Sequence, residues 1–465
     1  MQIEYVTHAS LSIRSRGITV LTDPFYFFDE IASAFLRHFP PRQLDADSFG
    51  RLDYVYSSHI HIDHSHPETL EVLKRKIGTV LLPAARPGLE RRYRELGFDD
   101  IILLENGKPT ALRDGVEVTS YWSDPVDSAL VVRMDGVTVL HQNDCVLNAE
   151  TLRLMASQHA IDYAFIWYTS SQSLNPMILP RTQAELDQLA QRREDTNFGK
   201  QIECIDILKP RVVVPYSMTM TYVNADQIWL NGIGRLTPVT FLERVSRLRP
   251  EQRTLIMQPG DVIDRERDTV IPYRDTNLWG TDLPSYLRNI EEFARNEPTV
   301  DQKFVCGDLD AAEPEILAHF RKRFERPFAE HLHGQTVELT LRGDTATRTY
   351  LIDTMAKELV TDPVEASRRR KPILTIAMPV KAFLWLIDMK WDPFHVLFCR
   401  RIEFTFGLPL TLPADDETLL YIYSLVSIVD YQMQVDPSEV TRLLAATRIQ
   451  SVVNRAMSGA ELHAG

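Results

Sequence analysis

The stretch that decides the fold is His59-Ile60-His61-Ile62-Asp63-His64, which directly follows the apolar run Asp53-Tyr54-Val55-Tyr56. Three imidazoles and a carboxylate within six residues are a ligand set that suits a divalent transition metal. In an extended segment residues i and i+2 point to the same side, so His59 and His61 can converge on one ion. Asp63 and His64 follow, just before the helix that Pro67 predicts, and can serve a second ion. The alternative is a solvated, histidine-rich loop that binds no metal.

The segments around this motif predict short strands interleaved with helices. Asp135-Gly136 lies between two apolar runs and is the strongest hairpin signal of the chain. Strand pairs interleaved with helices favour an α/β sandwich with antiparallel hairpins over a doubly wound sheet. No GxGxxG or Walker sequence is present, so a nucleotide-loop enzyme has no support. The predicted strands include residues 11–13, 18–21, 53–56, 79–82, 129–134, 137–140, 162–168 and 212–214, and the predicted helices include 89–97, 183–193, 198–208 and 283–293.

The length of the chain and the change in its sequence pattern from about residue 275 predict more than one domain. A chain of 465 residues is long for a single core and suggests two or three domains. We expect a metal-binding domain over residues 1–275 and a helix with a linker over residues 276–302. Residues 303–465 are expected to form a smaller α+β domain of unknown role.

Composition excludes several classes of protein. Asp and Glu number 64 against 51 Lys and Arg, a net charge of −13 that argues against nucleic-acid or anionic-membrane binding. The longest apolar run, Leu419 to Val429, is 11 residues and too short to span a bilayer. The start, Met1 to Tyr5, has no signal-peptide character. The four cysteines are far apart, which argues against disulfides and against a Rieske cluster and favours a cytoplasmic protein.

The motif resembles the HxHxDH signature of the metallo-β-lactamase superfamily. Thr22-Asp23-Pro24, after Thr7-His8-Ala9-Ser10, is similar to the opening of the lactonase-like branch, and Asn143-Asp144-Cys145 to the later segment with the bridging Asp. The resemblance implies an αββα sandwich for residues 1–275. It also implies that His59 and His61 hold one metal, that Asp63 and His64 hold the other, and that Asp144 bridges the two.

Two histidines of that family have no counterpart here. The stretch Tyr121 to Pro125 lacks one, and Asp124 is its nearest substitute as a metal ligand. The segment that normally ends in the last histidine reads Val214-Pro215-Tyr216-Ser217-Met218, so Tyr216 takes that position, either facing the metals or simply packing. Asp63 and Tyr216 are the candidate catalytic residues. His141 and His159 lie elsewhere and are expected to be structural.

Within the superfamily the chain is most similar to the catalytic part of the CMP-N-acetylneuraminate hydroxylase family. Lys209 to Tyr216 and Pro259 to Asp264 add to that resemblance. It implies a monooxygenase using O₂, in a family that carries a Rieske cluster at its N-terminus. This sequence begins directly at the metal-binding fold, so electrons are expected from a separate reductase or ferredoxin, or from the substrate at a di-iron centre.

We therefore predict a non-haem iron oxygenase with one or two iron ions, acting on a small organic or carrier-bound substrate. The first alternative is a zinc or manganese hydrolase of a lactone, ester or phosphodiester, in which the metal lowers the pKa of bound water. The second is a non-catalytic metal- or ligand-binding protein. Two roles are open for the C-terminal domain: it can shape a lid over the site, or it can mediate a homodimer.

Overall fold

The computed structural model describes residues 1–27, 36–84, 86–123, 127–169, 183–217, 219–225, 227–267, 269–297, 307–329, 332–388, 402–406 and 424–430. The chain divides into two compact units. The first comprises Met1–Ser173 and Ala190–Pro298, and the second Leu174–Leu189 and Thr299–Gly465. Within the described residues, the helices are too short or too polar to cross a lipid bilayer.

An eight-stranded sheet forms one half of the first unit. Its strand order is β16-β15-β1-β2-β3-β5-β6-β7. Strands β1, β2 and β3 pair antiparallel, whereas β3, β5, β6 and β7 run parallel. As a result, β1, β3 and β5 all end at the same edge of the sheet. The strands are β1 (Gln2–Thr7), β2 (Ser10–Ser15), β3 (Ile18–Thr22), β5 (Leu52–Tyr56), β6 (Ile77–Pro83), β7 (Ile101–Leu104), β15 (Val262–Asp264) and β16 (Thr269–Ile271).

A six-stranded sheet of order β13-β12-β11-β10-β9-β8 forms the other half. Its β10–β11 hairpin turns at Asp135-Gly136, where both residues have positive φ (51° and 70°), as a two-residue turn of this kind requires. The predicted hairpin is therefore correct. The strands are β8 (Thr110–Ala111), β9 (Glu117–Tyr121), β10 (Ala129–Met134), β11 (Val137–His141), β12 (Tyr163–Trp167) and β13 (Val212–Tyr216), of which the last three run parallel.

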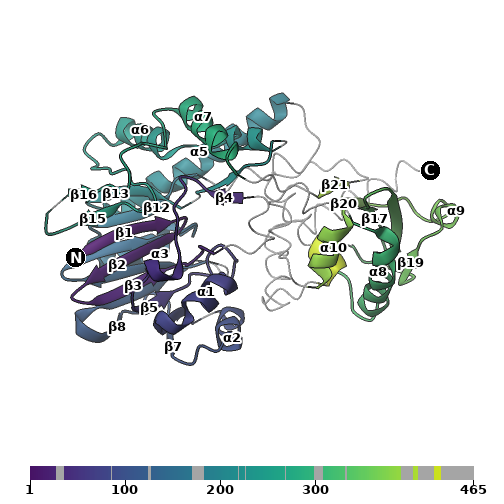
Figure 1. Ribbon diagram of the computed structural model, residues 1–465, viewed down its shortest axis with the longest axis horizontal. Coiled ribbons are helices and arrows are strands. Elements are labelled where there is room, and N and C mark those ends of the chain that lie inside the picture. Colours follow the sequence, from purple (N-terminus) through teal and green to yellow (C-terminus); the bar gives the residue numbers. More distant parts are fainter. Residues whose placement is uncertain are drawn as a thin grey trace. The chain divides into compact units, whose positions relative to one another are not determined.

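The two sheets pack face to face between helices, as Figure 1 shows for the first unit. All five residues of β5 are buried because the strand is covered on both faces. Tyr54 and Tyr56 face the core between the sheets, while Leu52 and Val55 face the opposite side. The helices around the sheets are α1 (Pro67–Leu73), α2 (Pro87–Glu95), α3 (Ala149–Gln158), α5 (Gln183–Leu208) and α6 (Pro238–Leu248). This is the αββα sandwich predicted from the sequence.

Two details differ from the sequence prediction or extend it. The helices predicted over residues 183–193 and 198–208 are one continuous helix, α5, because residues 194–197 between them are helical too, and α5 ends two residues before Pro210. A smaller cluster joins α7 (Leu283–Ala294) to Phe39 and Trp279 through Tyr286 and Ile290. Beside it, β4 (Leu36–His38) pairs with β14 (Met220–Tyr222).

The second unit holds a five-stranded sheet of order β19-β18-β17-β20-β21. Val337, Leu339 and Leu341 alternate with polar residues, as in a strand with one buried face, and all three are buried on β17. Phe320 of α8 stacks on Phe383 of α10, with ring centroids 6.0 Å apart. The elements are α8 (Leu309–Arg323), β17 (Thr336–Arg342), β18 (Thr347–Asp353), β19 (Glu358–Val360), α9 (Pro363–Ala366), β20 (Leu374–Pro379), α10 (Val380–Ile387) and β21 (Glu403–Phe406). The unit has the α+β composition that was predicted.

Candidate metal centre

The ligands predicted in the described residues lie at the carboxyl ends of strands, and so do His8 and Asp23, which were not predicted as site residues. His8 follows β1, Asp23 follows β3, the motif from His59 follows β5, and Asn143 and Asp144 follow β11. Parallel strands in one sheet end at a common edge, and the crevice outside that edge is where ligands bind in α/β folds. The topology therefore gathers side chains from distant parts of the sequence at one place.

Four residues at these strand ends have strained backbones. The φ angles of His8, Asp23, Asn143 and Ser217 are 46°, 39°, 49° and 69°, in the left-handed region that only glycine adopts freely. Each costs about 1–2 kcal/mol relative to ordinary backbone. Strain of this kind persists where the surrounding structure imposes it, and it is concentrated at functional sites.

His59 and His61 bring two imidazole nitrogens together. His59 Nε2 lies 2.8 Å from His61 Nδ1, and the rings are 4.4 Å apart. His59 Nδ1 lies 2.5 Å from Asp127 Oδ1, so a proton held there leaves the Nε2 lone pair directed at His61. Burial, followed by the nearby His59, lowers the pKa of His61 to about 3. His61 is therefore neutral, the form in which imidazole binds a metal.

The backbone of the motif is fastened to the second sheet. Tyr56 Oη lies 2.7 Å from Ser128 Oγ, and that Oγ donates to the carbonyl of Ser58 at 2.6 Å. Ser57 and Ser58, both fully buried, are the only residues between β5 and His59. The position of His59 is thus fixed relative to strands on both sheets.

Asp63, His64 and Asp144 form a second cluster beside the first. His64 Nε2 lies 3.5 Å from both Asp63 Oδ2 and Asp144 Oδ1. Neither His64 Nε2 nor Asp144 Oδ1 has a hydrogen-bond partner among the described residues, although both atoms are buried. Ligand atoms of His59, His64 and Asp144 lie within 4.8 Å of one another. Buried, unpartnered atoms of mixed nitrogen and oxygen character fit a divalent transition metal.

The carboxylates give this cluster a negative field. Burial acts to lower the pKa of His64, but Asp144, Asp63 and Asp23 raise it well above its ordinary value. A site that holds positive charge this strongly at an imidazole favours a cation there. Asp63 and Asp144 keep 19% and 21% of their side chains exposed, whereas His59 and His64 are fully buried. The carboxylate side of the site therefore faces solvent.

Asp23 is not a proposed ligand but holds residues of the centre in place through hydrogen bonds, a role that the sequence analysis missed. Its fully buried carboxylate accepts from Ser58 N (2.8 Å), Ser58 Oγ (2.8 Å), His64 Nδ1 (2.9 Å) and His141 Nε2 (3.0 Å). Burial acts to raise the pKa of Asp23, but His141 and His64 hold it below its usual value. A carboxylate on one ring nitrogen fixes the tautomer and leaves the other nitrogen for the metal. Its only signal in the sequence was the family resemblance of Thr22-Asp23-Pro24.

Tyr216 lies next to the centre but is engaged elsewhere. Its hydroxyl accepts from the backbone N–H of Asn143 at 2.6 Å and lies 2.7 Å from His141 Nδ1. Burial raises its pKa well above the ordinary value, so the phenol stays protonated and can donate to His141. Tyr216 thus positions the segment that carries Asp144.

Asp127 is the carboxylate that the structure places at His59, and the sequence analysis did not name it. Burial, followed by the charge of Asp144, raises the pKa of Asp127 to about 6. The signal was the acidic stretch before β10, from which the sequence analysis selected Asp124. Asp124 lies outside the described residues.

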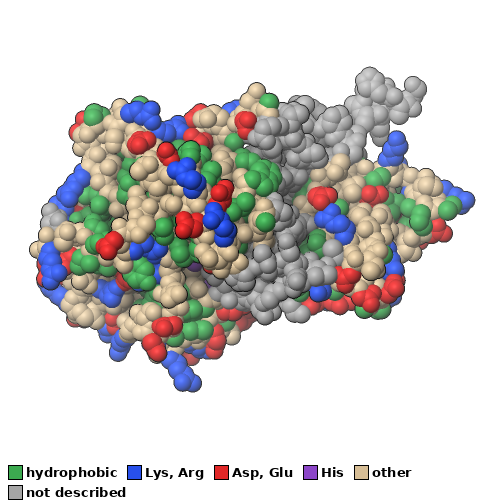
Figure 2. Space-filling model, turned by 45° about the horizontal axis from the view of Figure 1, so that its top comes forward, with side chains coloured by type: hydrophobic (Ala, Val, Ile, Leu, Met, Phe, Trp, Pro, Cys, Tyr) green, Lys and Arg blue, Asp and Glu red, His purple; other side chains and the backbone are tan. Residues whose placement is uncertain are grey.

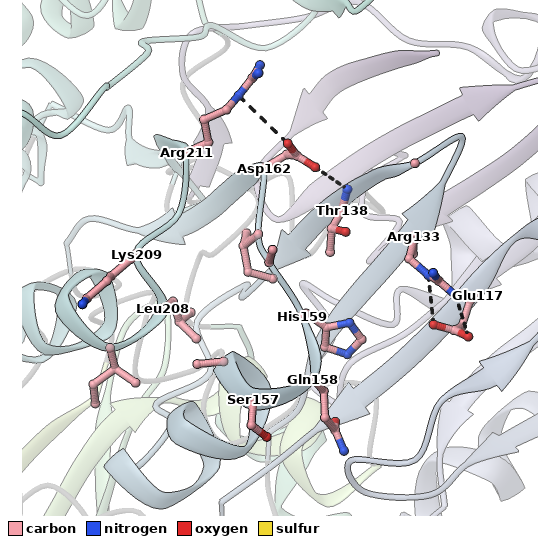
Figure 3. Close-up of a pocket in the computed structure, with 15 residues that line it drawn as sticks. Glu117, Arg133, Thr138, Ser157, Gln158, His159, Asp162, Leu208, Lys209 and Arg211 are labelled. Atoms are coloured by element: carbon pink, nitrogen blue, oxygen red, sulfur yellow. Dashed lines mark hydrogen bonds and ion pairs between the residues drawn. The ribbon is translucent and has the colours of Figure 1, made fainter.

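A different polar pocket lies at the opposite, amino ends of β11, β12 and β13 (Figure 3). Two ion pairs lie among its lining residues, Arg133 with Glu117 and Arg211 with Asp162. His159 lies in this pocket, 2.8 Å from Tyr121 Oη. Neither ligand cluster found among the described residues includes a residue of this pocket.

The family comparison agrees with the fold and the site. Residues 2–163 match the model of the beta-lactamase superfamily domain. A protein of Mycolicibacterium smegmatis named as a Rieske 2Fe–2S iron–sulfur protein is 28% identical over 405 residues, which is 80% of this chain and 75% of the relative.

Two shorter matches are to hydroxylases. The 4-amino-L-phenylalanyl-[CmlP-peptidyl-carrier-protein] 3-hydroxylase of Streptomyces venezuelae is 26% identical over 236 residues, 46% of this chain and 43% of that protein. The cytidine monophosphate-N-acetylneuraminic acid hydroxylase of Asterias rubens is 35% identical over 77 residues, 16% of this chain and 12% of that protein. Residues 2–163 thus match the superfamily that was predicted from His59 to His64, and this match confirms that prediction.

Proposed function

We propose that this chain is a non-haem iron oxygenase that hydroxylates a small organic or carrier-bound substrate. The observation that carries the proposal is the composition of the ligand set. Three histidines of the motif share the site with the carboxylates of Asp63, Asp127 and Asp144. Mixed sets of histidine and carboxylate ligands with open positions are typical of non-haem iron oxygenases.

The residues of the site have separable tasks. His59, His61 and Asp144 would hold one iron ion, and Asp63, His64 and Asp144 the other. Bound there, iron would supply the activation of O₂ for hydroxylation. Asp127 and Asp23 keep protons on the outer nitrogens of His59 and His64, so that the inner nitrogens remain available. The partly exposed edges of Asp63 and Asp144 mark the side from which substrate would approach.

The relatives support this choice over hydrolysis. The two hydroxylases align with parts of this chain, and one acts on an amino acid held by a peptidyl-carrier protein, as its name states. We infer that a carrier-bound substrate is a reasonable class to test here. An oxygenase also needs electrons. The four cysteines of this chain are too dispersed to ligate a Rieske centre, so we propose an external donor.

Metal analysis is the decisive experiment. Protein produced without metal supplementation should contain iron, close to two ions per chain, and protein reloaded with ferrous iron should consume O₂ in the presence of a chemical reductant. His59→Ala and His61→Ala should each lower the iron content. His159→Ala removes a buried histidine far from the site and should leave the iron content unchanged.

The match to the beta-lactamase superfamily domain makes a hydrolase the alternative function to test. Zinc or manganese instead of iron, together with cleavage of bis(p-nitrophenyl) phosphate in the absence of O₂, would overturn the oxygenase proposal in favour of this alternative. Full retention of iron in both motif variants would overturn the proposed ligand set.

A further inference from the structure

We propose that His8, from the turn between β1 and β2, is a ligand of the second metal ion together with Asp63 and His64. The inference rests on the proposed metal centre and adds a residue that the HxHxDH motif does not contain. His8 lies 55 residues before Asp63 in the chain, yet its Nε2 is 3.2 Å from Asp63 Oδ2.

The three side chains converge on one point. His64 Nε2 is 3.5 Å from the same Asp63 oxygen, and the rings of His8 and His64 meet edge to face at 5.4 Å. One ligand atom from each of His8, Asp63 and His64 lies within 4.8 Å of the other two. These spacings bring three donor atoms around a single position, as ligands of one ion require.

One ring nitrogen of His8 is buried without a partner in the described part of the chain, and the other faces a carboxylate oxygen. His8 is 1% exposed, and its Nδ1 has no hydrogen-bond partner among the described residues. A proton on Nε2 would satisfy Asp63 but leave Nδ1 as a buried, unpaired acceptor. A proton on Nδ1 would leave the Nε2 lone pair facing a carboxylate oxygen. The second arrangement is repulsive unless a cation lies between the two atoms, which is the arrangement of a metal ligand.

The backbone of His8 is held in a strained conformation that aims the ring at Asp63. Its φ is 46°, and its N–H donates to Thr219 Oγ1 at 3.1 Å. The ring packs beside those of Phe25 and His38, with centroids at 6.1 and 5.9 Å. A histidine kept at positive φ in a fixed pocket indicates that the imidazole itself is needed there.

The structure also gives this ion a reason to need His8. The segment after β13 supplies Tyr216, whose hydroxyl is engaged with His141 and with the backbone of Asn143. It is not available to complete a set made of Asp63, His64 and Asp144. His8 reaches the cluster from the first sheet and would supply the further nitrogen.

Cobalt(II) titration tests the inference, with visible absorption and equilibrium dialysis as readouts. Wild-type protein should bind two Co²⁺ ions per chain, and His8→Ala should bind one at concentrations that saturate the wild type, with a changed absorption spectrum. His8→Gln should fail in the same way, because an amide can donate to Asp63 but is a poor ligand for the metal. His38→Ala removes a neighbouring half-buried imidazole and should still bind two, and thermal unfolding confirms that each variant is folded.

The outcomes separate this inference from the proposed function. If wild type binds no Co²⁺, the metal centre itself is refuted. If wild type binds two ions and His8→Ala also binds two with the same spectrum, only the role of His8 is refuted. Retention of two ions in His8→Gln, with affinity reduced by less than about 100-fold in His8→Ala, would make His8 an orienting donor and overturn its assignment as a ligand.

Discussion

A single oxygen atom, Oδ2 of Asp23, accepts hydrogen bonds from Ser58, His64 and His141. The chain of contacts runs on from His141 to Tyr216 and the backbone of Asn143. Residues from both sheets are therefore joined through one buried carboxylate behind the proposed ligands. Its role cannot be read from local sequence, because Asp23 and His141 are 118 positions apart.

Replacing this carboxylate should weaken metal binding without removing a ligand. In Asp23→Asn the side chain can no longer accept from both histidines through a charged oxygen, so the His64 tautomer is less well fixed. We expect Co²⁺ affinity to fall by about 10–100-fold, measured by competition with a chromophoric chelator. Asp206→Asn, at an ion pair with Arg249 outside the site, is the matched control and should not change the affinity. Equal affinity in the two variants would argue against the supporting role of Asp23.

At the scale of elements, the strands and turns with strong local signals were predicted, and the contacts between distant segments were not. Asp135-Gly136 predicted its hairpin because a two-residue turn depends on those two residues alone. Asp63 and His64 were identified because they adjoin His59 in sequence. His8 and Asp127 were not predicted as site residues, since only the packing of β1, β5 and β10 brings them to the motif.

Two glycine substitutions should shift stability in opposite directions. Gly136 has φ of 70° with open space around it, so Gly136→Ala adds only backbone strain, about 1–2 kcal/mol. Gly199 lies inside α5, also with open space, so Gly199→Ala should stabilise by up to about 1 kcal/mol. Urea denaturation followed by circular dichroism measures both changes. Stabilisation by Gly136→Ala would contradict the turn geometry assigned to Gly136, and destabilisation by Gly199→Ala would contradict the open helical position assigned to Gly199.

At the scale of the whole molecule, all of the proposed ligands belong to one of the two compact units. On the face shown in Figure 2, Lys and Arg side chains are interspersed with Asp and Glu side chains. The charge that distinguishes the site is thus the cluster of Asp23, Asp63, Asp127 and Asp144, of which Asp23 is fully buried. A bound ion would stabilise the unit that contains this cluster.

Calorimetry can test whether a bound ion stabilises only the unit that contains the site. A ligand at 100 times its dissociation constant stabilises the folded form by about 2.7 kcal/mol. Removing metal with a chelator should therefore lower the unfolding temperature of the first unit and leave the transition of the second unit in place. Scanning calorimetry of the full chain with and without Co²⁺ measures this. Equal shifts of both transitions would show that the two units unfold as one.

The bond from Ser128 to the carbonyl of Ser58 has an evolutionary consequence. Because Ser57 and Ser58 alone connect the anchored Tyr56 to His59, inserting or deleting one residue there would turn His59 toward the wrong face of the strand. Loops around the metal site can lengthen or diverge to suit new substrates, but the spacer of two serines must keep its length. Descendants of this chain can change what they modify far more easily than they can change the distance between β5 and its first imidazole.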